Sequence, residues 1–355
     1  MKKIFRIVGT VLSIAAITLF LDFAATMTVL QDVFGTQRDD AEAGNLRAYT
    51  GAPYHHDLVP NLETPRVWGP IIYPWKADRY GFRTGTCAPG EAEKSWPAIF
   101  VIGDSFVEAL GSSYEQSFVG LMACDAAKQK KAVWNLGVAS YSPIIYWRKV
   151  LAAAKKLDVK PSEIYVFLDL SDIDDEANVY REAADGTVKY QYLQEHTGSD
   201  PVQWAVRHFT TARLLYDLYL TASFNWWMSM GRPRARWTID KTLMDKWGGK
   251  GLELAGRNLD KLVELCREWQ CRVTLVVYPW PDNVMAGDRD SIQVRHWRDW
   301  SAKRGVRFID GFAPFFNDPS QSVLHKYYIE GDVHFTEAGN RLIYETAKQA
   351  MGGDW

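Results

Sequence analysis

The sequence has almost no net charge. It contains 41 Lys and Arg residues against 43 Asp and Glu residues, for a formal net charge of -2 over 355 residues. Proteins that bind DNA or RNA usually carry an excess of basic residues, because their affinity comes largely from phosphate contacts. We therefore expect no nucleic-acid partner. The chain also lacks internal repeats and low-complexity tracts, and its 47% hydrophobic content is typical of an ordinary folded protein.

Cysteine is scarce, with residues at positions 87, 124, 266 and 271 only. Their spacing matches no zinc signature, and we expect neither a bound metal nor a cofactor. An even number of cysteines can pair in an oxidising compartment, and Cys266 and Cys271 are close enough to pair across a helix end. Buried or free thiols are an equally open interpretation.

The first thirty residues carry a targeting pattern. Lys2, Lys3 and Arg6 precede a charge-free apolar run from Ile7 to Leu21. We interpret residues 1–30 as an uncleaved, single-pass anchor in the cytoplasmic (inner) membrane, with the rest of the chain on the periplasmic side. A cleaved signal peptide is the alternative, although no convincing small-x-small cleavage site follows closely.

The remaining chain divides into a polar, proline-rich segment at 31–95, interpreted as a stalk that wraps onto the domain, and one large domain at 96–355. Within this domain, short apolar runs predict buried strands at 98–102, 132–136, 164–168, 272–277 and 306–309. Helical patterns separate or follow them at 117–128, 146–157, 252–269, 292–304 and 337–351. This alternation predicts an α/β fold with a parallel sheet covered on both faces.

One stretch, from about 176 to 251, breaks the alternation. It contains an aromatic helical region from Val202 to Met230 and is interpreted as a helical insertion. It could serve as a lid, a substrate platform, a membrane-facing element or a simple cover over the sheet.

The strongest local motif is Gly103-Asp104-Ser105, which directly follows the first predicted strand. A serine in this position lies at the carboxyl edge of the sheet, where ligands bind and where helix N-termini offer N–H groups to an oxyanion. Asp and Ser after a strand are also good helix N-caps, so the motif alone does not establish a nucleophile.

A second motif, Asp332-Val333-His334, precedes the last predicted helix. In an extended loop, residues two apart point the same way, so the Asp332 carboxylate can reach the His334 imidazole. A serine hydroxyl needs such a base to become a nucleophile. A turn-capping role before the helix is the alternative, but two motifs at matching places favour a Ser105-His334-Asp332 triad.

The order of these motifs resembles the SGNH/GDSL hydrolase family over roughly residues 96–350. The sequence GDSF at 103–106 is similar to that family's nucleophile block, NLGVAS at 135–140 to its second block, VFLDLSDI at 166–173 to its third, and DVH at 332–334 to its closing block. The resemblance implies a flavodoxin-like three-layer α/β/α sandwich and acyl transfer through an acyl-serine intermediate.

The resemblance also suggests oxyanion donors, with departures from the family pattern. The family glycine falls at Ser140 or at Gly137, and the family asparagine aligns with Ser171. The implied donors are the N–H of Ser105, the N–H of Ser140 or Gly137, and the Ser171 hydroxyl. Losing one such donor can cost roughly 10²- to 10³-fold in rate. The Asp-to-His spacing is one residue shorter than the family's commonest form.

Two further features are ambiguous. Trp280 follows a predicted strand at the same edge and could stack on a sugar or acyl group, or simply pack there. The acidic run from Asp169 to Glu176 lacks the spacing of a calcium loop, so we interpret it as a partly solvated rim of the active site rather than a metal site.

Together, these patterns predict a serine esterase or O-acyltransferase. Its expected substrate is an acylated carbohydrate of the cell envelope or an exported one, or a small ester, with acetyl as the expected acyl group. A transferase could receive its acyl group from an integral membrane partner. The alternatives are a non-catalytic polysaccharide-binding or assembly factor with a degenerate fold, and a lipid esterase.

Overall fold

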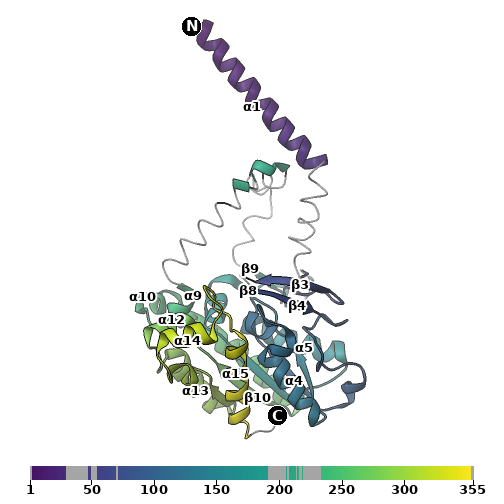
Figure 1. Ribbon diagram of the computed structural model, residues 1–355. Helices are drawn as coiled ribbons and strands as arrows, with labels where there is room; N and C mark the ends of the chain where they lie inside the picture. Colours follow the sequence, from purple (N-terminus) through teal and green to yellow (C-terminus); the bar gives the residue numbers. More distant parts are fainter. Residues whose placement is uncertain are drawn as a thin grey trace. The chain divides into compact units, whose positions relative to one another are not determined.

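The computed structural model describes residues 2–28, 47–48, 54–68, 71–190 and 233–352, with a few positions between 205 and 218 (Figure 1). The chain forms two compact units, one of residues 1–48 and 192–231 and one of residues 49–191 and 232–355. The first contains helix α1 (Lys2–Thr28) and the two-residue strand β1 (Arg47–Ala48). Near the end of α1, Asp22 accepts a hydrogen bond from the Thr211 hydroxyl at 2.5 Å.

Among the described residues, no helix combines the length and the apolar character needed to cross a membrane. The membrane anchor predicted at residues 1–30 stays a prediction. Most of the aromatic region predicted from Val202 to Met230 lies outside the described residues, so its role stays open. The flanking parts of the predicted insertion, 176–190 and 233–251, belong to the second unit.

The second unit is built on a five-stranded parallel sheet, in the order β11-β10-β7-β5-β6. Its strands are β5 (Ala98–Ile102), β6 (Ala132–Asn135), β7 (Glu163–Leu168), β10 (Arg272–Val277) and β11 (Arg307–Asp310). All five runs predicted as strands are strands, with bounds that differ by at most one residue. β5 and β7 are buried at every position, as expected for strands covered on both faces.

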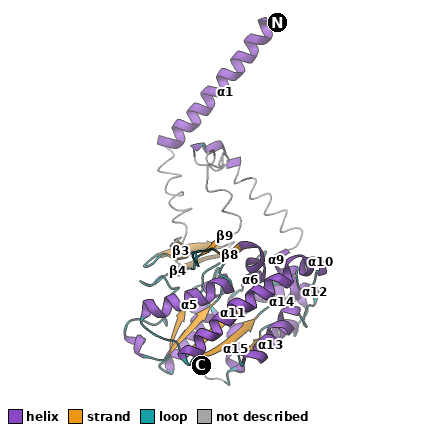
Figure 2. Cartoon of the chain, turned by 180° about the vertical axis from the view of Figure 1, so that it is seen from behind, coloured by secondary structure: helices purple, strands orange, loops and turns teal. Residues whose placement is uncertain are grey.

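Helices cover both faces of this sheet (Figures 1 and 2). The crossover β5-α4-β6 runs toward one sheet edge, and the crossover β6-α5-β7 runs back in the opposite direction. Because both crossover connections are right-handed, α4 and α5 lie on opposite faces of the sheet. α15 packs beside α4 on the first face, and α11 packs beside α5 on the second. The five helices are α4 (Phe118–Lys128), α5 (Pro143–Leu157), α11 (Gly249–Trp269), α13 (Ile292–Arg304) and α15 (Glu337–Ala350). The predicted parallel α/β fold is confirmed, and its strand order is the flavodoxin-like 2-1-3-4-5.

The segment predicted as a stalk contains a folded hairpin. Strands β3 (Glu63–Trp68) and β4 (Ile71–Lys76) pair antiparallel, with Pro65 opposite Pro74. Proline lacks an N–H donor and within sheets occurs mainly in edge strands. The prolines of this segment therefore predicted turns rather than strands. Alternate residues of β4 point inward: Tyr73 and Trp75 are 4% and 1% exposed.

Both pairs of cysteines form disulfides, Cys87–Cys124 and Cys266–Cys271. The second joins the end of α11 to the start of β10, which agrees with pairing across a helix end. The remaining elements are short: β2 (Asp57–Leu58), α3 (Ser105–Glu108), α6 (Ser171–Asp174), β8 (Tyr180–Glu182), β9 (Val188–Tyr190), α9 (Pro233–Arg236), α10 (Lys241–Leu243), α12 (Pro281–Ala286), α14 (Ser320–Tyr327), and the helical turns at 92–95, 114–116, 175–179, 244–248 and 313–316.

Candidate active site

Ser105 lies where the winding of the sheet changes direction. The chain leaves β5 toward β6 on one side, and β7 lies on the other side of β5, so the carboxyl end of β5 is a topological switch point. Gly103 permits the sharp exit, because a Cβ there would lie 2.4 Å from the Val107 side chain and 2.7 Å from the Phe167 carbonyl. Asp104 then caps α3 by accepting the Phe106 N–H at 3.1 Å. Ser105 is thereby held at the start of a short helix.

The structure brings Ser105, His334 and Asp332 together. The Ser105 hydroxyl lies 2.8 Å from His334 Nε2, and His334 Nδ1 lies 2.5 Å from Asp332 Oδ1. The same carboxylate oxygen accepts the His334 backbone N–H at 2.8 Å. A tight turn supports both residues, since Asp332 N–H donates to the Ile329 carbonyl and Ile329 N–H to the His334 carbonyl, each at 2.9 Å.

The charge state of Asp332 suits a base-orienting role. Burial alone would raise the pKa of this carboxyl, but the hydrogen bonds and charge of His334, helped by Trp68, lower it to about 2. An ionised Asp332 accepts the Nδ1 proton of His334, which leaves Nε2 with a lone pair for the serine proton. His334 itself is only 6% exposed, so water competes little for this contact.

Two aromatic rings hold the imidazole in place. Phe106 lies 4.9 Å from the ring centre of His334, and Trp68 stands perpendicular to it at 5.1 Å. Trp68 is the last residue of β3 and therefore comes from the segment predicted as a stalk. The sequence carries no signal for this contact, because it depends on how the hairpin packs onto a loop far along the chain.

The backbone points to Ser140 as the second oxyanion donor. The Gly137 N–H is already bonded to the Asn135 side chain at 3.0 Å, which argues against the Gly137 alternative. The N–H groups of Ser105 and Ser140 have no hydrogen-bond partner in the described part of the chain. Ser140 has φ 65°, in the left-handed region that favours glycine, as expected where the family carries a glycine. The Tyr180 hydroxyl donates to the Ser140 carbonyl at 2.7 Å and so holds this peptide.

Two predicted contacts are not available in this geometry. The Ser171 hydroxyl donates to Asp169 at 2.8 Å, so its single proton is already used within the protein. Trp280 is 6% exposed and its indole N–H donates to Asp169 at 3.0 Å. The burial leaves little ring face for stacking on a sugar, which favours the packing alternative for Trp280. Asp169, rather than a ligand, organises both side chains.

Most of the acidic run is buried, although it was predicted as a partly solvated rim; Asp174 alone among its carboxylates is half-buried. Carboxylate oxygens of Asp104, Asp169 and Asp172 lie within 4.8 Å of one another, and all three residues are buried. Burial, followed by the charge of Asp169, raises the pKa of Asp104 and of Asp172 well above the ordinary value. These three side chains could in principle hold a cation. Asp169, however, already accepts four donors, from Ser171 N–H and hydroxyl, Asp172 N–H and Trp280. A raised pKa favours the neutral form of Asp104 and of Asp172, which lowers the charge repulsion within the cluster.

The chain resembles several solved structures, at low sequence identity. No protein-family profile matches the chain, and no curated protein matches it. Solved structures that resemble it include a member of the lipolytic G-D-S-L family from Veillonella parvula, with 16% identity over 71% of this chain and 96% of that one and a TM-score of 0.40.

Other similar structures are esterases and hydrolases. An acetylxylan esterase from Geobacillus stearothermophilus, solved as a catalytic mutant, shows 16% identity over 73% of this chain and 95% of that one, with a TM-score of 0.39. An α/β hydrolase from the Lake Arreo metagenome shows 15% identity over 76% and 99%, with a TM-score of 0.40. At these TM-scores the likeness does not indicate a function. The function proposed below is inferred from the geometry of Ser105, His334 and Asp332.

Proposed function

We propose that the protein is a serine esterase or O-acyltransferase that acts through an acyl-serine intermediate. The observation that carries this proposal is the continuous hydrogen-bonded relay from Ser105 through His334 to Asp332, at 2.8 Å and 2.5 Å. Such a relay serves one purpose in proteins with a neutral serine, namely to remove its proton during attack.

The chemistry follows from the positions of these groups. Ser105 Oγ attacks the ester carbonyl while His334 Nε2 takes the hydroxyl proton, and Asp332 stabilises the resulting imidazolium. The N–H groups of Ser105 and Ser140 are placed to stabilise the oxyanion. His334 then returns the proton to the leaving alcohol. Water or a sugar hydroxyl, deprotonated by His334, then attacks the carbonyl of the acyl-serine. The bond from that carbonyl to Ser105 Oγ breaks, His334 returns the proton to Oγ, and the acyl group leaves as an acid or as a new ester.

The substrate and location are finer parts of the same proposal. An acetyl ester of a cell-envelope or exported carbohydrate suits an enzyme outside the cytoplasm, and the disulfides Cys87–Cys124 and Cys266–Cys271 support an oxidising compartment. The basic and apolar N-terminal pattern supports delivery to the membrane. A transferase reaction would require an acyl donor, for which an integral membrane protein is the expected partner.

Turnover of 4-nitrophenyl acetate by the full chain tests the proposal. Ser105→Ala and His334→Ala should lose this activity, while Ser95→Ala, at an exposed serine, should retain it. Mass spectrometry of the quenched wild-type reaction should locate an acetyl group on Ser105. Activity that survives Ser105→Ala, with no adduct on Ser105, would contradict the proposal.

A further inference from the structure

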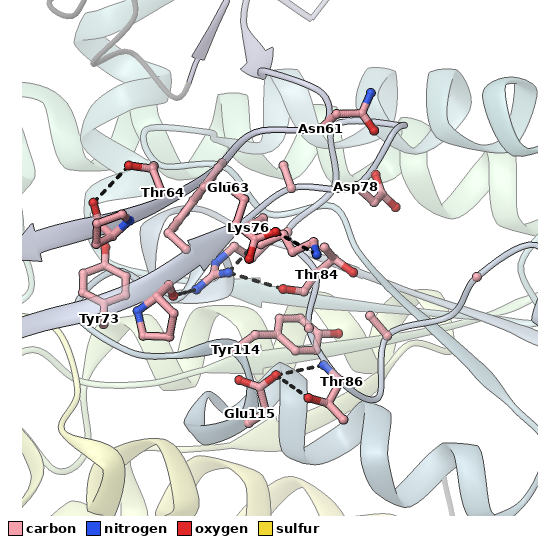
Figure 3. A pocket seen from close by; sticks show the side chains of 18 of the residues that line it. Asn61, Glu63, Thr64, Tyr73, Lys76, Asp78, Thr84, Thr86, Tyr114 and Glu115 are labelled. Atoms are coloured by element: carbon pink, nitrogen blue, oxygen red, sulfur yellow. Dashed lines mark hydrogen bonds and ion pairs between the residues drawn. The ribbon is translucent and has the colours of Figure 1, made fainter.

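A large groove runs along the β3–β4 hairpin, outside the triad. Its volume is about 1090 Å³, and the hairpin residues Thr64, Tyr73 and Lys76 line one side of it. Tyr114 and Glu115, together with the chain at 83–90, line the other side (Figure 3). Nothing in the proposed acyl-transfer chemistry uses this groove, which is larger than an acetyl ester requires.

The walls of the groove are fixed before any ligand arrives. Glu115 accepts the N–H and the hydroxyl of Thr86 at 2.8 Å and 3.0 Å. The buried guanidinium of Arg83 donates to the carbonyls of Pro74 and Ser112, at 3.1 Å and 3.3 Å, and so ties the hairpin to the body. The disulfide between this wall and α4 adds a covalent restraint. A preformed groove avoids the entropic cost of ordering loops on binding.

The side chains that line the groove offer hydrogen-bond donors and acceptors, and together they carry little net charge. The side chains of Asn61 and Thr84 make no hydrogen bond among the described residues, so they are available to a ligand. Glu63 and Lys76 pair across the hairpin at 2.9 Å, which neutralises the exposed charges at the rim. Exposed Ile72 adds apolar surface. Neutral hydroxyl and amide groups beside small apolar faces suit a neutral polyhydroxylated chain better than an anionic polymer or an acyl chain.

One wall of the groove belongs to the hairpin that also contacts the imidazole. Tyr73, on its wall, lies two residues along β4 from Ile71, which pairs with Trp68. Two residues of a strand span about 7 Å, and Trp68 contacts the catalytic imidazole directly. Tyr73 is also hydrogen-bonded to the backbone of Gly111, and a Cβ at Gly111 would lie 3.2 Å from the Trp68 ring. One hairpin therefore borders both the groove and the imidazole.

We propose that this groove binds a neutral carbohydrate chain and presents an acyl ester on that chain to Ser105. This inference rests on the proposed function. It names the substrate class as an oligosaccharide or polysaccharide rather than a single sugar or a small ester, because only a chain can occupy the groove and reach the triad at once.

Chain-length dependence of the reaction tests this proposal. Rates for the full chain are measured with 4-nitrophenyl acetate, with acetylated xylose, and with acetylated xylo-, manno- and cello-hexasaccharides. At least one hexasaccharide should exceed the monosaccharide by about tenfold or more in kcat/KM. Thr86→Trp, which fills the groove, should remove about tenfold of that advantage and leave 4-nitrophenyl acetate turnover within about twofold.

Two further variants sharpen the result. Asn61→Gly combined with Thr84→Val removes the available polar groups, and glycine tolerates the φ of 58° at Asn61. Thr242→Trp, at an exposed threonine of α10, is the matched control and should leave all substrates unaffected. Equal rates for short and long sugars, unchanged by Thr86→Trp, would overturn the groove proposal while the triad stands.

Binding separates this proposal from the proposed function. Calorimetry with the full-chain Ser105→Ala variant and the unacetylated hexasaccharides needs no catalysis. Binding that Thr86→Trp abolishes would support the groove even if no ester is turned over. Absence of binding to all three hexasaccharides, together with no chain-length effect, would refute it.

Discussion

The protonation state of Asp104 yields the sharpest prediction. This carboxyl is 3% exposed and lies 3.2 Å from the Ser105 hydroxyl, and burial followed by Asp169 raises its pKa well above the ordinary value. A neutral acid at this place still accepts the Phe106 N–H. It is a weaker acceptor for the serine hydroxyl than a carboxylate, so it competes less with His334 for the serine proton. We expect Asp104→Asn, which has the same shape and no charge, to behave like the wild type.

The expected magnitudes follow from the contacts. Asparagine keeps the helix cap, so kcat/KM for 4-nitrophenyl acetate should stay within about threefold of the wild-type value. Asp104→Ala loses the cap and the contact to the serine hydroxyl, each worth about 1 kcal/mol. Stability should therefore fall by about 2 kcal/mol, with a drop in kcat/KM of about tenfold.

The assay combines chemical denaturation with steady-state rates measured between about pH 6 and pH 9. If Asp104 is neutral over this range, kcat/KM should depend on pH in the same way for the wild type and for Asp104→Asn. Asp240→Ala, which removes the equivalent cap of α10, is the control and should change stability without changing rate. If Asp104→Asn folds normally yet loses about a hundredfold or more in kcat/KM, the carboxylate is needed in its charged form and the reasoning is refuted.

Three other outcomes are expected. Ser140→Gly should raise the free energy of unfolding by up to about 1 kcal/mol, because it relieves a left-handed backbone, and should retain activity in the ester assay because the N–H remains. Burial raises the pKa of Asp175 and of Glu176 to about 7, so both bind extra protons when folded. Stability measured by urea unfolding should therefore fall as pH rises from about 5 to about 8, and Glu176→Gln should flatten this dependence. Loss of the Cys87–Cys124 disulfide, which closes a separation of 37 residues, should cost about 3 to 4 kcal/mol. Thermal unfolding of the double variant Cys87→Ser/Cys124→Ser against the wild type measures this cost.

The sheet and the triad could be predicted because local patterns dictate them. A run such as Ala98–Ile102 is short, rich in β-branched residues and apolar at every position, which is typical of a strand covered on both faces. The motif at Ser105 directly follows β5, and the motif at 332–334 comes after the last strand and immediately before α15. Both can therefore reach the carboxyl edge of the parallel sheet. Resemblance to a known family then reinforced what the spacing indicated.

Other parts of the site depend on tertiary packing that no local pattern encodes. Asp169 and Asp172 look solvated in sequence because isolated carboxylates avoid the interior. Burial raises the pKa of Asp172 and so favours its neutral form, while hydrogen-bond donors such as the Trp280 indole stabilise Asp169. The choice between Ser140 and the less favoured Gly137 as oxyanion donor depends on the partner of the Gly137 N–H, which is the Asn135 side chain.

The position of Trp68 against the imidazole affects how the chain can be shortened. A fragment that begins at Ala98 contains every triad residue and the whole parallel sheet. It would nonetheless expose one edge of His334 to bulk water, where the ring could turn away from the serine. Such a fragment also lacks Cys87, the disulfide partner of Cys124, so it should be less stable and, under the proposed function, a poor catalyst. The smallest active form of the chain should therefore begin upstream of the hairpin.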